Sequence, residues 1–139
     1  MMFLIVAAVA LSQSGIPFTT VARGPISGIE SPRQVTVRSQ AEWETLWKAH
    51  AGSQAIPPVD FSSTMVVGVF LGSRPSGGFT VEISRIVREG GSLIVEYRER
   101  KPGPGAVAAQ LLTSPFHLVT LDRQDGPVEF RAVETKGGK

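Results

Sequence analysis

The two histidines, His50 and His117, are the residues best suited to proton transfer or metal binding in this chain of 139 residues. Together with Asp60 they could form a zinc site, but neither has a second ligand at helical spacing, and no HExxH motif occurs. No serine lies in a GxSxG turn, which presents the nucleophile of many hydrolases. The chain has no cysteine, which excludes thiol nucleophiles, iron–sulfur clusters and lipid attachment through cysteine. We therefore expect a non-enzymatic protein with no catalytic residue, metal or cofactor.

A glycine-rich segment, residues 72–79, follows an apolar stretch and superficially resembles a phosphate-binding loop. A P-loop requires Lys and then Ser or Thr after its second glycine, with a helix to follow. Here Gly78 and Phe79 occupy those places and a strand pattern follows, so nucleotide binding is not expected. Two interpretations remain open: a tight connection that uses glycine for positive φ, or a recognition loop that carries Arg74.

Length and charge limit the possible partners. A chain of 139 residues fits one domain, which can bury a sufficient core without disulfides or metal. Its 14 Lys+Arg and 12 Asp+Glu leave a net charge of +2, and basic residues alternate with acidic ones, as in residues 96–101. Such interleaving is typical of a solvated surface and lacks the basic cluster of a duplex-binding protein. Nucleic acid is therefore not an expected partner.

One helix is predicted over residues 40–51. Ser39 and Glu42 have the spacing of a capping box, and Gly52 can end the helix in a left-handed conformation. Trp43 and Trp47 lie on one helical face together with Leu46 and His50, so we expect the indoles in the core. Replacement of Trp47 by alanine is expected to cost about 3–5 kcal/mol.

The remaining pattern predicts a mainly β (α+β) fold, an antiparallel sheet scaffold in the form of a sandwich or partly open barrel. The apolar run 64–71 predicts a central strand buried on both faces, with Gly68 at a bulge or a close approach. Residues 79–101 alternate as a hairpin around the turn 89–92. Further strands are expected at residues 18–23, 34–38, 107–113, 116–121 and 128–133.

The first 22 residues carry no charged side chain, and residues 1–11 are continuously apolar. That run is too short to span a bilayer and is typical of a signal-peptide core. We expect residues 1–14 to be a signal peptide, 15–136 a single β-rich domain and 137–139 a frayed tail. The mature protein is then secreted, periplasmic or associated with the cell envelope, without a membrane span.

Several short motifs follow one another along the chain. They are Gly24, Ser27-Gly28-Ile29, Trp43, Leu46-Trp47, His50, Pro57-Pro58-Val59-Asp60-Phe61, Val66-Val67, the segment 72–79, Pro102-Gly103 and residues 113–119. In this order they resemble the C-terminal domain of PrcB-like proteins. The resemblance implies a non-enzymatic, exported or envelope-attached protein linked to protease complexes, and it implies no catalytic residues.

Two functional classes remain. One is an exported module that binds a partner protein, such as a protease or another envelope protein, through loops at one end of the scaffold. The other is a small-ligand or glycan binder that uses the indoles and Tyr97, which would require exposed tryptophan.

If residues 64–134 form consecutive antiparallel strands, links 73–78, 102–105 and 123–126 share one end, while 89–92 and 114–115 share the other. The candidate partner-binding residues are Ser73, Arg74, Pro75, Ser76, Gly77, Gly78, Pro102, Gly103, Pro104, Gly105, Arg123, Gln124 and Asp125. In such a patch, Arg74 and Arg123 would bind carboxylates or carbonyls, and their replacement would leave stability within about 0.5 kcal/mol.

Overall fold

The computed structural model describes residues 15–103 and 111–134. The expected signal peptide 1–14, the residues Pro104 and Gly105 and the tail 137–139 lie outside these ranges. The elements follow in the order β1 (Thr19–Gly24), β2 (Arg33–Val37), α2 (Gln40–Ala51), β3 (Thr64–Phe70), β4 (Thr80–Glu89), β5 (Ser92–Arg100), β6 (Phe116–Asp122) and β7 (Val128–Ala132).

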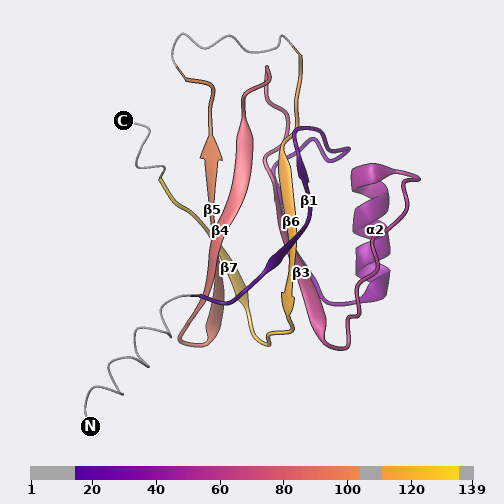
Figure 1. Ribbon diagram of the computed structural model, residues 1–139, viewed down its shortest axis with the longest axis vertical. Coiled ribbons are helices and arrows are strands. Elements are labelled where there is room, and N and C mark those ends of the chain that lie inside the picture. The colour runs from indigo at the N-terminus through magenta and orange to yellow at the C-terminus, as the bar shows by residue number, and fades with distance from the viewer. Residues whose placement is uncertain (1–14, 104–110, 135–139) are drawn as a thin grey trace.

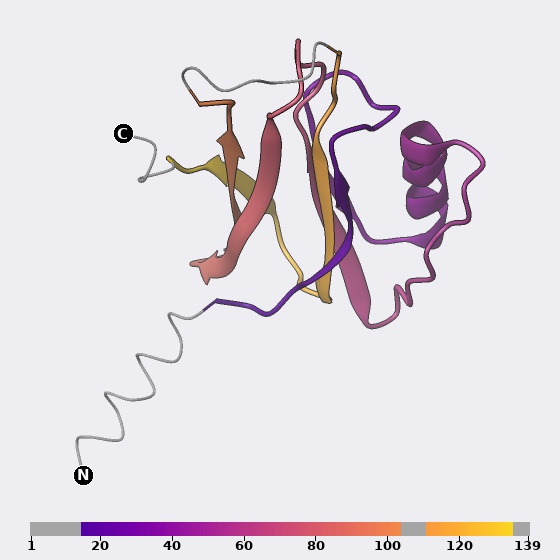
Figure 2. The same ribbon diagram turned by 45° about the horizontal axis from the view of Figure 1, so that its top comes forward.

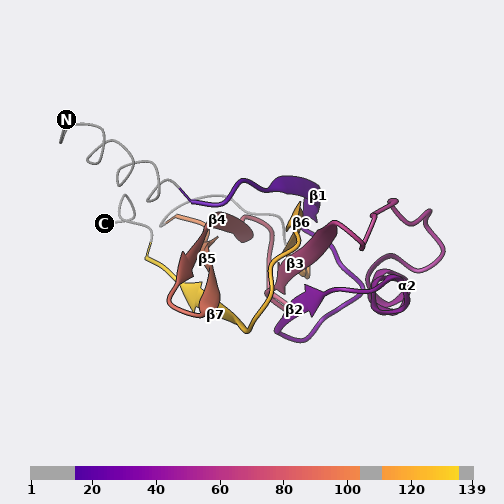
Figure 3. The ribbon, with the colours of Figure 1, turned by 90° about the horizontal axis from the view of Figure 1, so that it is seen from below.

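Three layers make up the described fold, which is mainly β with one helix, as the sequence predicts (Figure 1). A four-stranded sheet of order β1-β6-β3-β2 lies between α2 and a three-stranded sheet of order β4-β5-β7. The tilted view in Figure 2 and the view from below in Figure 3 show the two sheets side by side, with the helix beyond the larger sheet. The strands within the described ranges form no closed barrel.

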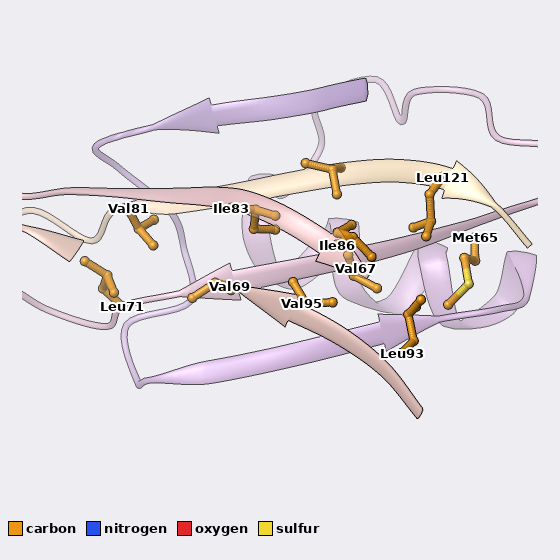
Figure 4. Close-up of a cluster of buried hydrophobic side chains, with 11 residues drawn as sticks. Met65, Val67, Val69, Leu71, Val81, Ile83, Ile86, Leu93, Val95 and Leu121 are labelled. Carbon is orange, nitrogen blue, oxygen red and sulfur yellow. The ribbon is translucent and has the colours of Figure 1, made fainter. Parts of the chain in front are cut away.

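Strand β3 is the centre of the fold because it is buried on both faces, as its continuous apolar sequence predicts. Successive side chains of a strand point to opposite faces, so Met65, Val67 and Val69 face the small sheet, while Val66 and Phe70 face the helix. The first core lies between the sheets and the second lies under α2. Figure 4 shows the first core, with side chains from both sheets meeting between them.

A close approach explains the glycine in the middle of β3. A Cβ atom on Gly68 would collide with the Leu118 side chain of β6 and lie 3.2 Å from Cγ2 of Val35 in β2. Both neighbouring strands therefore press on this position, and the predicted close packing at Gly68 is confirmed.

The helix ends as the sequence predicts. The Ser39 hydroxyl accepts a hydrogen bond from the Glu42 amide, and Gly52 adopts a φ of 62° at the other end. Trp43, Leu46, Trp47 and His50 are all buried against the four-stranded sheet. Among the described residues, no helix is long and apolar enough to cross a bilayer.

The expectation that residues 64–134 form consecutive antiparallel strands is wrong. Among the described strands of this range, only β4 and β5 pair with each other as neighbours in sequence, because β3 and β6 lie together in the large sheet and β7 pairs with β5 in parallel. Strand β6 joins the large sheet between β1 and β3, and the chain then crosses to the small sheet, where β7 pairs with β5 in parallel. Strand β6 runs opposite to β5. The chain reverses direction again after β6, so β7 runs in the same direction as β5. Within the predicted strand 107–113, residues 107–110 lie outside the described ranges, and Thr113 forms an isolated antiparallel bridge with Arg74.

Candidate partner-binding groove

The predicted gathering of three loops at one end of the sheet is wrong, because Arg74 and Arg123 lie at opposite ends. Strand β6 pairs antiparallel with β3, with Phe116 opposite Phe70 at one end and Asp122 opposite Thr64 at the other. Arg74 follows β3 and Arg123 follows β6, so they leave the sheet in opposite directions. We call the end of the large sheet where β3 finishes and β6 begins the upper end, and the opposite end the lower end, after the direction of these strands in Figure 1.

At the upper end, two of the predicted loops do meet. A Cβ atom on Gly78 would lie 2.8 Å from the Pro102 ring, which places the 73–78 loop beside Pro102 and Gly103. The Pro115 carbonyl accepts a hydrogen bond from the Leu71 amide, so the 114–115 link also lies here, contrary to expectation. The sequence pattern predicted a further strand, 107–113, between β5 and β6, and with it one more reversal of the chain. The links 114–115 and 123–126 were therefore each predicted at the wrong end.

Arg74 acts as an internal clamp of the upper end. Its Nε and Nη2 donate to the two carboxylate oxygens of Glu99 at 2.8 and 3.2 Å, and Nη1 donates to the carbonyls of Leu71 and Ser73. The guanidinium carbon also lies 5.9 Å from the Phe79 ring centroid. These contacts hold the 72–79 loop against β5. They occupy most of the N–H groups of the guanidinium, so few remain to bind a partner.

Replacement of Arg74 by alanine is therefore expected to lower the free energy of unfolding by about 1 kcal/mol, because it removes a bidentate ion pair and two hydrogen bonds from the side chain to backbone carbonyls. Urea unfolding of the variant measures this loss. The matched variant Arg74→Lys keeps the charge but loses the two-pronged geometry, so we expect it to fall between wild type and alanine. A loss below about 0.3 kcal/mol would contradict the clamp.

The loop at the lower end is held by arginines in the same way. Arg123 donates to the carbonyls of Phe61 and Arg38, while Arg38 donates to the carbonyls of Gln124 and Gly126. Arg88 adds hydrogen bonds to the Gln124 side chain and the Asp125 carbonyl. The predicted site residues Arg123, Gln124 and Asp125 thus fix the turn that directs β7 into the small sheet.

A groove opens between the two sheets on the side where β2 faces β7. It has a volume of about 800 Å³, and we call it the inter-sheet groove. Its lining comes from both sheets: Pro32, Arg33, Gln34, Val69, Phe70, Leu71, Arg74, Tyr97, Glu99, Arg100, Lys101, Pro102, Gly103, Ala132, Val133 and Glu134. Arg74, Pro102 and Gly103 were predicted as site residues, whereas the β2 and β7 sides of the groove were not, because sequence patterns do not show which strands are edges.

The opposite side of the sandwich is closed by hydrogen bonds between the sheets. His117 of β6 accepts from the Ile83 amide of β4 at 2.9 Å, and Arg23 of β1 donates to the Val81 carbonyl. Ile16 adds a backbone bond to Ile86. On the groove side, Nε2 of the Gln34 side chain donates to the Tyr97 hydroxyl at 3.0 Å and links the sheets within the groove wall. The sandwich is therefore open along one side.

The rim of the groove is basic. Four basic and two acidic side chains line it, and Arg74 and Glu99 are paired with each other. Within the described part of the chain, the side chains of Arg33, Arg100 and Lys101 make no hydrogen bond or ion pair, and all three are exposed. They leave a local excess of positive charge that an acidic ligand can neutralise.

His50 and Asp60, two of the possible zinc ligands, make hydrogen bonds within the fold. The His50 ring accepts or donates a hydrogen bond with the Ser27 hydroxyl at 2.8 Å and packs edge-on against Phe116, and burial lowers its pKa. Asp60 accepts hydrogen bonds from the amide and hydroxyl of Ser62, which lower the pKa of its carboxyl. Among described residues, no three His, Asp or Glu side chains gather as metal ligands would.

The indoles offer no platform for a glycan. Trp43 is fully buried and Trp47 is 7% exposed. Their Nε1 atoms donate to the carbonyls of Pro57 and Gln54, so both polar groups are satisfied inside the protein. The alternative function that requires exposed tryptophan therefore loses its main residues.

In a comparison with known protein families, residues 65–122 match the family described as PrcB C-terminal. The matched stretch begins in β3 and ends with β6, so it includes the central strand and the upper loops, whereas α2, β2 and β7 lie outside it. No curated protein and no solved structure matches the chain.

Proposed function

Because residues 65–122 of this chain match the family described as PrcB C-terminal, we propose that the protein is an exported, non-enzymatic module that binds another envelope protein. The association of the family with protease complexes suggests the partner class, a protease or a protein bound to one. On this proposal the module stabilises or regulates that complex.

The observation that carries the proposal is the inter-sheet groove. The described part of the chain places a concave surface of about 800 Å³ between two sheets, with exposed, uncompensated arginine and lysine at its rim. Tyr97 and Pro102 add rigid apolar surface, which loses little conformational entropy on binding. Within the predicted 73–78 loop, Arg74 lines the groove, whereas Ser73, Pro75, Ser76, Gly77 and Gly78 do not.

Site-specific photo-crosslinking tests where the partner binds. A photoreactive phenylalanine analogue at position 33 or 101 is expected to crosslink one envelope protein in living cells, because both side chains reach into the groove. The matched control is position 48, where another exposed lysine lies on α2 away from the groove. Mass spectrometry then identifies the partner. Equal crosslinking from positions 48 and 101, or none from the groove, would contradict the proposal.

Export is part of the same proposal. We expect the mature chain to begin near Gln13 or Gly15, because an uncharged start with an 11-residue apolar run suits a signal peptide. N-terminal sequencing of the protein isolated from cell fractions measures this directly. Retention of Met1 together with a cytosolic location would overturn the proposed export.

A further inference from the structure

We propose that the partner binds by adding an extended peptide, with alternating acidic and apolar side chains, to the free edge of β2. This inference rests on the proposed protein-binding function and names the form of the bound segment. Three features carry it: an unpaired strand edge, a hollow on each face of that edge, and a different chemistry in each hollow.

Strand β2 is the last strand of the large sheet, with β3 on one side. On its other side, the described residues provide no strand to pair with its amides and carbonyls. An exposed strand edge of this kind is a template for a further strand, and several domain families bind peptides in this way. Figure 3 shows β2 at the border of its sheet, facing the side of β7.

Both faces of this edge border a hollow. The inter-sheet groove lies on the face toward the small sheet, where Arg33 and Gln34 contribute to its wall. A second hollow of about 510 Å³ lies on the face toward α2 and is lined by Arg33, Gln34, Val35, Thr36, Val37, Ala41, Glu42, Thr45 and Leu46. Because side chains of a strand alternate between faces, an added strand would direct every second side chain into each hollow.

The chemistry of the two hollows differs. Toward the small sheet, Arg100 and Lys101 outnumber Glu134, the acidic lining residue other than the paired Glu99, and this excess of positive charge suits carboxylates. Arg33 lines both hollows at the upper end of β2, and its place in the strand puts it on the same face as Val35 and Val37. Toward the helix, much of the lining is aliphatic, from Val35, Val37, Ala41 and Leu46, and Glu42 is already bonded to the Arg38 amide. The matching ligand is therefore a segment with acidic residues on one face and small aliphatic residues on the other.

The ends of β2 set the length of the segment. Arg38 closes the lower end, because its guanidinium crosses to the carbonyls of Gln124 and Gly126 in the small-sheet turn. At the upper end, Pro32 precedes β2 and lines the groove together with Lys101. Between these limits β2 has 5 residues, so a ligand of about five to seven residues covers the edge at roughly 3.3 Å per residue.

The test uses labelled synthetic peptides and the purified mature chain. A seven-residue peptide of alternating glutamate and valine is expected to bind in fluorescence anisotropy, whereas the same residues in two blocks, or lysine in place of glutamate, should bind much more weakly. The peptide amides form two alternating sets, and only one set can donate to β2 because a strand pairs along one edge only. Methylation of that set should abolish binding, and methylation of the other set should be tolerated.

Matched protein variants locate the binding. Lys101→Glu is expected to weaken binding of the glutamate–valine peptide about fivefold or more, while Lys48→Glu, with the same change in net charge on α2, should change it less than about twofold. Unchanged melting temperatures of both exposed variants show that folding is retained. Equal weakening by the two variants would overturn the inference.

Other results distinguish this inference from the proposed function. If positions 33 and 101 crosslink a partner but the alternating peptide does not bind, strand addition is wrong and groove binding stands. If methylation is tolerated in both registers, the peptide binds without pairing and the inference fails. If sedimentation shows a dimer that excludes the peptide, a second copy of the chain covers β2, and the inference fails as well.

Discussion

Replacement of Trp43 by alanine is expected to lower the free energy of unfolding by about 3–5 kcal/mol, as large a loss as that expected for Trp47→Ala. Trp43 is fully buried between α2 and the large sheet, and its ring centroid lies 5.5 Å from that of Trp47. Truncation would leave a cavity that the paired sheet strands cannot fill, and it would leave the Pro57 carbonyl without its donor.

Urea unfolding followed by circular dichroism measures the loss. Trp43→Phe serves as the matched control, because it keeps most of the ring volume and removes the hydrogen bond to Pro57. We expect phenylalanine to recover more than half of the stability lost with alanine, since the packing contribution exceeds that of one hydrogen bond. An unchanged melting temperature for Trp43→Ala would show that α2 is not packed as described.

The second large effect is a loss of stability in acid that originates at His117. Its ring is 3% exposed and lies at the junction of the sheets. Nδ1 accepts a hydrogen bond from the Ile83 amide, so the proton of the neutral ring is on Nε2, which donates to the Thr20 hydroxyl at 2.8 Å. Protonation of Nδ1 would break the bond to Ile83 and place a buried charge between the sheets.

Burial, and then the positive charge of Arg23, lower the pKa of His117 from 6.5 to about 4, while Glu82 acts in the opposite direction. In the unfolded chain the ring binds a proton near pH 6.5, and in the folded chain it stays neutral until about pH 4. The stability due to the neutral ring is therefore complete above pH 6.5 and is lost as the pH falls toward 4. The loss is on the order of 2–3 kcal/mol.

Denaturant unfolding at several pH values between 7.5 and 4 checks this prediction. His117→Gln is the informative variant, because its amide can accept from Ile83 and donate to Thr20 without titrating. We expect it to be less stable than wild type at pH 7.5 and to lose less stability on acidification. Parallel pH profiles for the two proteins would assign the acid sensitivity to other groups, such as His50, whose pKa burial also lowers.

Local patterns were sufficient to predict most elements of the fold. Ser39, Glu42 and Gly52 mark the ends of α2, and the apolar run around Gly68 marks the strand that both cores share. Hydrogen bonds at helix ends and alternation along strands depend on neighbours within a few residues, so the sequence contains them directly. Burial of the indoles was predictable for the same reason, because helical spacing places them on one face.

The groove could not be predicted in this way. The sequence determined that Arg74 follows a buried strand and that Gln34 begins another, but the register of β6 against β3 decided which loops share an end. The crossing of the chain after Asp122 into the other sheet decided that β7 runs parallel to β5 and that β2 keeps a free edge. Pairing between strands distant in sequence depends on packing of the whole chain, because many registers satisfy the same local pattern and the shared cores select among them. The sequence thus specified the strands and the helix, and the tertiary structure decided where the protein is open to a partner.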